Sequence, residues 1–198
     1  IHFESNQIKD RHNSNDVNIF ETVLHKSEGL SNFFYEELMT MAKECKTGMN
    51  GNKYLDALIK FGFCETLFEF IEEDTPTIRF MKREIPRLPD ISKYKQLDQL
   101  IITDAKLVEL HSSIGSLSNL EMLVLTNNCI KELPKEIGNL KKLTFINLIG
   151  NPIKNIPTEI SYLDKSNGGS LFRLAIKEDE IGEKNYLRLK ELLPSTKF

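Results

Sequence analysis

Tryptophan is absent from the 198 residues, and no run of about 18 apolar residues occurs. A membrane-spanning helix needs such a run, so the sequence predicts no membrane span. The N-terminal stretch IHFESNQIKDRHNSN lacks the basic and apolar regions of a signal peptide. This favours a cytoplasmic protein, with a secreted effector as the alternative. The chain does not begin with methionine, so a leader or an upstream domain could precede Ile1.

Cysteine is scarce, and Cys45, Cys64 and Cys129 form no CxxC pair. An odd number of isolated cysteines suits a reducing compartment and argues against a disulfide framework and a structural zinc site. Cys64 lies near an expected helix start, where a reactive thiolate could be stabilised. A buried core thiol is the favoured interpretation for Cys64 and for Cys45.

Patterns typical of enzymes are also missing. The four histidines show no HxxxH or HExxH spacing, and the glycines of TGMNGN lack the Lys-Ser/Thr of a phosphate-binding loop. We therefore expect no catalytic residues, no metal and no cofactor, and we expect that the protein is not an enzyme.

The net charge is small, and the charged side chains are unevenly distributed along the chain. The formal net charge is −3, but residues 1–74 hold 14 acidic and 7 basic side chains, whereas residues 75–198 hold 15 and 19. Such a small basic excess is too weak for nucleic-acid binding. The asymmetry indicates two units with different surfaces.

What the chain does have is an internal repeat of 23 residues. The stretch LEMLVLTNNCIKELPKEIGNL, which begins at Leu120, recurs from Leu143 with the same residue classes at nine positions. In the first of these copies the matched positions are Leu120, Leu123, Leu125, Asn128, Ile130, Leu133, Pro134, Ile137 and Leu140.

Three further copies depart from this template. The copy that begins at Leu97 keeps the apolar positions but has Ala105 in place of Asn and His111 in place of Pro. Weaker copies lie around residues 78–94 and 171–181, and in the last of them Asp179 takes the Asn place. The array therefore contains about five units.

The motif L-x-x-L-x-L-x-x-N-x-L at this period resembles the leucine-rich repeat family over residues 75 to about 181. The variant LPKEIGNL is similar to the 23-residue class found in intracellular scribble-like and Ras-suppressor-like proteins and in many bacterial proteins. The resemblance implies an α/β leucine-rich repeat solenoid with a parallel sheet on its concave side, where ligands usually bind.

The residue pattern agrees with that architecture. In L-x-x-L-x-L alternate side chains point inward from an extended strand, so stacked copies bury one face of a sheet. In the family the Asn is buried and its amide bonds neighbouring backbone groups, which Asn128 and Asn151 can do. Ala105 has no side-chain amide to form these hydrogen bonds, and an ionised Asp179 can only accept them. We therefore expect the hydrogen bonds between coils, the Asn ladder, to be weakest at these two positions. Each Pro follows the strand at a turn toward the convex side.

The ends of such a stack must be covered. We expect a C-terminal capping helix at about 183–193, within a repeat domain over residues 75–198, and a flexible segment at 1–15. Residues 16–74 are expected to form a helical cap or domain. Its helices are indicated by the stripe Phe34, Leu38, Met41, Ala42 and Cys45, by Leu55, Leu58 and Ile59, by the stretch CETLFEFIEE, and less clearly by Val17 to Leu24.

The positions between the inward residues form the candidate binding surface. In the middle coils they are mainly apolar, with a polar and cationic rim that includes Arg79 and Lys177, as in protein-binding surfaces. The predicted partner-binding residues are Gln99, Ile101, Met122, Val124, Phe145, Asn147, Ile149 and Arg173. Two simpler explanations remain open: outward aliphatic residues also favour strand formation, and another part of the chain could cover them.

These patterns favour a non-enzymatic scaffold that binds a protein partner on its concave face, as a monomer, with self-association as the alternative. A different hypothesis is a bacterial effector-like or signalling protein in which the repeats target a functional N-terminal helical domain.

Overall fold

The computed structural model describes residues 2–4, 7–9, 28–45, 53–60 and 63–198. The chain divides into two compact units, residues 1–70 and residues 71–198, and each is described by itself. Within the described residues, no helix has both the length and the apolar character needed to span a bilayer.

The first unit is mainly helical. Its elements are β1 (His2–Glu4), β2 (Gln7–Lys9), α2 (Glu28–Glu44), α3 (Lys53–Lys60) and the 3-10 helix η1 (Cys64–Phe70). Within the expected stripe of α2, Leu38, Met41 and Ala42 are buried, and Leu55 and Leu58 of α3 are fully buried. Tyr35 donates a hydrogen bond to Glu69, and burial together with this carboxylate raises the pKa of Tyr35 to about 12.

Three further expectations concern this unit. The helix expected for the stretch that begins at Cys64 is a short 3-10 helix. The N-terminal segment expected to be flexible contains an antiparallel pair, β1 with β2, in which Phe3 lies opposite Ile8. These are residue types that favour strands. The helix expected at 17–24 lies outside the described residues.

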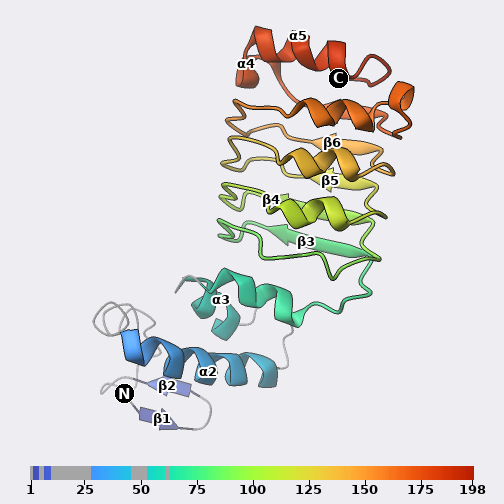
Figure 1. The fold of residues 1–198 in the computed structure, drawn as a ribbon. Helices are drawn as coiled ribbons and strands as arrows, with labels where there is room; N and C mark the ends of the chain where they lie inside the picture. Colours follow the sequence, from blue (N-terminus) through green and yellow to red (C-terminus); the bar gives the residue numbers. More distant parts are fainter. Residues whose placement is uncertain (1, 5–6, 10–27, 46–52, 61–62) are drawn as a thin grey trace. The chain divides into compact units, whose positions relative to one another are not determined.

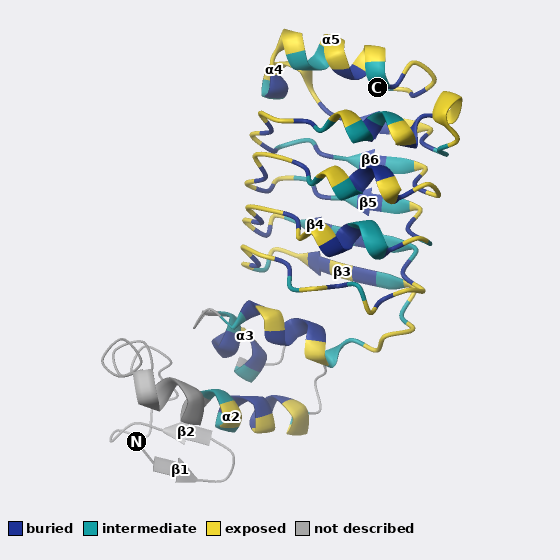
Figure 2. Cartoon of the chain, viewed as in Figure 1, coloured by how far each residue is buried: buried dark blue, intermediate teal, exposed yellow. Residues whose placement is uncertain are grey.

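The second unit is a stack of coils around a parallel sheet. The five strands are ordered β3 (Thr77–Met81), β4 (Gln99–Thr103), β5 (Met122–Val124), β6 (Phe145–Asn147) and β7 (Arg173–Ala175). Figure 1 shows the strands along one side of the array and the short helical turns along the other. This is the solenoid that the repeat predicts, and Figure 2 shows buried and exposed residues alternating along each coil.

The opposite side of the array consists of 3-10 turns, η2 (Ser112–Ser116), η3 (Lys135–Asn139) and η4 (Thr158–Leu163). Pro134 and Pro157 precede two of these turns with φ −67° and ψ 146°, and His111 precedes the third with φ −68° and ψ 144°. His111 therefore takes the backbone conformation of the proline it replaces. Its Nδ1 also accepts a hydrogen bond from the backbone N–H of Ser113.

Two buried amides, Asn128 after β5 and Asn151 after β6, join neighbouring coils. The Oδ1 atom of Asn128 accepts hydrogen bonds from the backbone N–H groups of Ala105 and Leu107, both at 3.1 Å. Its Nδ2 donates to the carbonyl oxygens of Ile102 and Leu125, at 2.8 and 2.9 Å. Each asparagine thus serves the preceding coil as well as its own.

Asn151 repeats these contacts one coil later. Its Oδ1 accepts from the N–H of Ile130 at 3.2 Å, and its Nδ2 donates to the carbonyl oxygens of Leu125 and Leu148. The expectation that Asp179 continues the series is wrong. After β7 the chain enters helix α4 (Glu178–Ile181), which leaves Asp179 exposed, and Glu180 accepts a hydrogen bond from the N–H of Gly150.

The C-terminal end of the array is covered by helices and by the end of the chain. Helix α5 (Glu183–Leu192) follows α4, with Leu189 and Leu193 each only 1 % exposed, and Tyr186 contacts the ring of Phe198. Lys197 pairs with Arg173 of β7 through backbone hydrogen bonds, so the last strand has a neighbour on both sides.

Asp164 connects this terminal segment to the last full coil. Its carboxylate is fully buried and accepts hydrogen bonds from the N–H groups of Ser166 and Ser195 and from the hydroxyls of Ser166 and Thr196. Burial by itself raises the pKa of Asp164, but these hydrogen bonds outweigh it and hold the pKa below its ordinary value.

Candidate partner-binding surface

The strand register aligns the outward side chains in columns across the sheet. The first column follows the start of each strand: Thr77, Gln99, Met122, Phe145 and Arg173. The second column is two residues further along: Arg79, Ile101, Val124, Asn147 and Ala175. Each column therefore passes from a polar edge through an apolar middle.

The apolar middle of this face is half-buried. Ile101, Met122, Val124, Phe145 and Ile149 have intermediate exposure, whereas the residues between them on each strand are buried in the core. Adjacent strands lie about 4.8 Å apart, so outward side chains of neighbouring coils shield one another. The result is an apolar surface of moderate exposure, in which Ile101, Met122, Val124 and Phe145 are neighbours and Asn147 separates Phe145 from Ile149.

The two ends of the face are more exposed. Arg79 on β3, Arg173 on β7 and Lys177 after β7 are exposed, and Gln99 and Asn147 are intermediate. Lys177 lies 3.7 Å from Glu180, which partly neutralises that corner. The side chain of Asn147 is also engaged locally, because its Oδ1 accepts a hydrogen bond from the N–H of Ile149.

Two residues of this face differ from expectation. Ala175 lies in the second outward column of the sheet but is only 8 % exposed. Met81 is 56 % exposed at the end of β3 but is missing from the predicted patch. The predicted patch covers the middle three coils, whereas Met81 lies on β3. Alternation along the strand also places Met81 outward, so this pattern is a signal that identifies it.

Catalytic and metal chemistry have little geometric support in the described part of the chain. No group of three or more His, Cys, Asp or Glu side chains there could hold a metal ion. Cys64 is 5 % exposed and Cys129 is exposed on the array. What this face offers is a surface of mixed apolar and cationic character.

Comparison with known proteins finds a family model and solved structures that are similar to the array. Residues 95–153 match the family model described as leucine rich repeat. Among curated proteins, no sequence matches the chain. A leucine-rich repeat protein of Leptospira interrogans is similar in structure, with 36% identity over 58% of this chain and 28% of that protein, and a TM-score of 0.53.

More distant structures are also similar. An internalin from Listeria monocytogenes matches with 19% identity over 52% of this chain and 28% of its own, with a TM-score of 0.44. The leucine-rich repeat domain of the type III effector XopL matches with 15% identity over 89% of this chain and 66% of its own, with a TM-score of 0.43. The chain spans less than a third of the Leptospira protein and of the internalin.

Proposed function

Because the repeat array belongs to the leucine-rich repeat family, we propose that the chain is a non-enzymatic module that binds a protein partner on the concave face of its sheet. The observation that carries this proposal is the apolar surface formed by Ile101, Met122, Val124 and Phe145, with Ile149 beyond Asn147. Surfaces of this kind, with a polar rim, are typical of protein interfaces.

The charges at the ends of the face suggest the chemistry of the partner. Arg79 and Arg173 are exposed at opposite edges of the apolar surface, and guanidinium groups pair well with carboxylates. A partner segment with an apolar centre and acidic ends would match this arrangement. Aromatic and Arg residues are also the ones that most often dominate binding energy, so Phe145 and Arg173 are the expected anchors.

The test is to replace Met122 and Phe145 with glutamate and to compare capture of proteins from an extract of the native host. We expect the variant to lose the proteins that the unchanged chain captures, because a buried carboxylate in the interface would have no partner. The variant should still fold, since both side chains lie outside the core, with a melting temperature lowered slightly by repulsion between two glutamates that are cross-strand partners. Val108→Glu is the matched control, because Val108 is an apolar residue that is 43 % exposed away from the strands.

Retention of the captured proteins by the Met122/Phe145 variant would exclude this face as the binding site. The second hypothesis, a functional N-terminal unit targeted by the repeats, is supported by the division into two units. Its best candidate nucleophile, Cys64, is a buried thiol. The buried thiol can be alkylated after unfolding, and the chain is then refolded. If the refolded chain keeps any activity assigned to the protein, Cys64 is not its nucleophile.

A further inference from the structure

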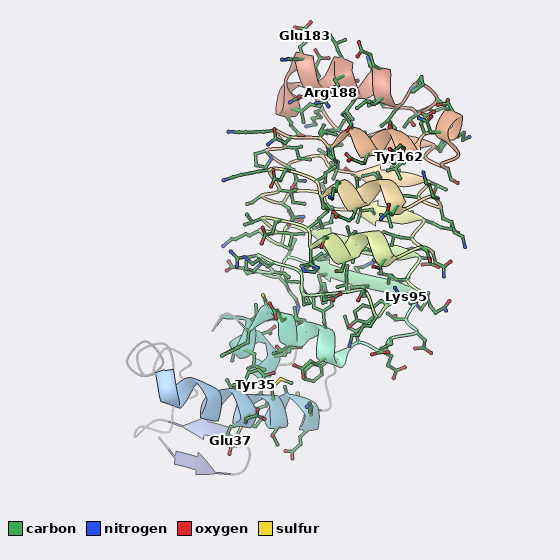
Figure 3. All side chains as sticks on the ribbon, viewed as in Figure 1. Tyr35, Glu37, Lys95, Tyr162, Glu183 and Arg188 are labelled. Carbon is green, nitrogen blue, oxygen red and sulfur yellow. The ribbon has the colours of Figure 1, made fainter. Side chains whose placement is uncertain are left out.

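Outside the concave face, a group of lysines and aromatic rings lies at the edge of the array where the strands begin. We define this lysine–aromatic surface as Lys141, Tyr162, Lys165, Phe172 and Lys197. Tyr162 and Phe172 are 51 % and 47 % exposed, among the most exposed large apolar side chains in the described part of the chain. Figure 3 labels Tyr162 at this edge, on the same side of the array as Lys95.

The members of the surface come from segments that backbone hydrogen bonds place side by side. Phe172 precedes β7, and the backbone of Lys197 pairs with the start of that strand. The backbone N–H of Leu171 donates a hydrogen bond to the carbonyl oxygen of Leu163. Phe172 follows Leu171 and Tyr162 precedes Leu163, so both rings lie on neighbouring segments.

Each ring carries lysine ammonium groups over its face. The Nζ atoms of Lys197 and Lys165 lie 4.5 and 5.6 Å from the ring centroid of Phe172. The Nζ atom of Lys141 lies 4.9 Å from the ring centroid of Tyr162 and also donates a hydrogen bond to the Tyr162 carbonyl oxygen at 2.8 Å. These contacts hold the ammonium groups in place and leave each of them further N–H donors for a ligand.

Among the described residues, no carboxylate pairs with the lysines of this surface. Within the described part of the chain, Lys141, Lys165 and Lys197 form no ion pair, although elsewhere in the array Lys93 pairs with Glu73 and Lys177 with Glu180. Lys142, beside this surface, donates its hydrogen bond to the neutral side-chain oxygen of Asn119. An anionic group that binds at this edge would therefore meet several lysine ammonium groups that lack a carboxylate partner among the described residues.

We propose that the lysine–aromatic surface is a second docking site, which binds an acidic segment of a partner protein through its carboxylates. The inference rests on charge complementarity and is independent of the concave face, because none of its five residues belongs to the two outward columns. Arg173 lies beside Phe172 at the border, so one partner could contact both surfaces.

The ring geometry favours a protein segment over a nucleic acid or a membrane. Bases bind single-strand sites by stacking on open aromatic faces, but the face of Phe172 is occupied by two ammonium groups. Insertion of this ring into a bilayer would require those two ammonium groups to enter the interface with it. Carboxylates need neither an open ring nor an apolar phase, because they pair directly with the ammonium groups.

The experiment measures fluorescence anisotropy of a labelled glutamate-rich peptide with the full chain, beside a peptide in which glutamine replaces every glutamate. We expect binding of the glutamate peptide only, and weakening as salt rises, since exposed ion pairs are screened. The double variant Lys165→Glu, Lys197→Glu should weaken binding about tenfold or more, because it converts two attractions into repulsions. Phe172→Leu should weaken it about two- to fivefold, because the ring no longer holds the ammonium groups.

The matched control is the double variant Lys131→Glu, Lys135→Glu, which makes the same charge change at exposed lysines away from this edge. Equal weakening by the control would mean that net charge alone drives binding and would overturn the proposal. Equal binding of the two peptides, or binding only to phosphatidylserine vesicles or to an oligonucleotide, would also overturn it. If the Lys165/Lys197 variant does not fold, the neutral variant Lys165→Gln, Lys197→Gln replaces it, with an expected loss in the same direction.

Discussion

At the scale of single residues, two kinds of buried polar group hold the array together. Asn128 and Asn151 use both halves of their amides, so each one satisfies backbone donors and acceptors that would otherwise be buried without partners. Asp164 does the same for the end of the chain with a charged group, which accepts only. Removal of any of these side chains leaves several backbone groups unsatisfied at once.

Asn128→Ala should lower the free energy of unfolding by about 2–4 kcal/mol, because it deprives the Ala105 and Leu107 N–H groups of their acceptor. Denaturant unfolding followed by circular dichroism measures this change. Asn155→Ala is the control at an exposed position and should change stability by less than about 0.5 kcal/mol. Equal effects of the two substitutions would contradict the role assigned to the amide.

Asp164 predicts a dependence of stability on pH. Its pKa in the folded chain is lower than the ordinary value of 3.8, so its stabilisation is complete above that value and is lost as the pH falls toward the folded pKa. The stability difference between the unchanged chain and Asp164→Ala, about 2–4 kcal/mol at neutral pH, should therefore shrink as the pH falls below 3.8. Urea unfolding at several pH values measures it, with the exposed Asp179→Ala as control. A difference that stays constant with pH would refute the assignment.

At the scale of elements, two of the convex turns, η2 and η3, pack so closely on the next coil that one position in each of them leaves no room for a side chain. A Cβ atom at Gly115 would lie 2.6 Å from the Cβ of Glu136, and one at Gly138 would lie 2.4 Å from the carbonyl oxygen of Glu159. The equivalent residue of the next coil is Ser161, where the following segment is a loop and the turn η5 (Lys165–Asn167) in place of another repeat. The requirement for glycine thus comes from the neighbouring coil and not from the backbone angle.

Gly138→Ala should lower the free energy of unfolding by about 1–3 kcal/mol, because the backbone at Glu159 would have to move. In an exposed helix the same change would instead stabilise by about 1 kcal/mol, so the sign of the effect is diagnostic. Ser161→Ala is the matched control, since a Cβ atom is already present there. Thermal unfolding of the two variants compares them, and a stabilised Gly138→Ala variant would contradict the close packing.

The elements of the array could be predicted because the repeat fixes which side chains alternate. From Leu123 and Leu125 the pattern gives a strand, and the same spacing aligns its neighbours in register. The last coil was less predictable, since α4 replaces its corner and exposes Asp179. Asp164 was missed because its partners Ser195 and Thr196 are distant in sequence.

The candidate surfaces divide in the same way. The positions on the concave face follow from alternation along a strand, although their role as a binding site stays a prediction. The lysine–aromatic surface joins residues from four separate segments of the chain, and no local pattern in the sequence connects Lys141 with Tyr162 or Lys197 with Phe172. Such contacts depend on the fold, so they become visible only in three dimensions.

At the scale of the whole molecule, the chain consists of a repeat unit over residues 71–198 and a helical unit before it. The repeat unit contains its own core, from Ile78 to Leu193. Parallel strands join every coil to its neighbours, so the unit should unfold as a whole.

We therefore expect a fragment of residues 71–198 to fold by itself. Its far-ultraviolet circular dichroism should show a single cooperative thermal transition. A matched fragment that ends at residue 163 lacks β7, α4 and α5 and should lose that transition, because the last coils would be uncovered. A fragment 71–198 without a cooperative transition would show that the helical unit is needed for folding.

The number of coils sets the distance between Arg79 and Arg173, which lie at opposite ends of the sheet. Each added repeat contributes one strand, so a duplicate of residues 120–142 would move the edge at Arg79 away from the edge at Arg173 by about 4.8 Å. A partner that contacts both arginines at once fits only one such distance. Its affinity should therefore fall when a whole repeat is added or removed.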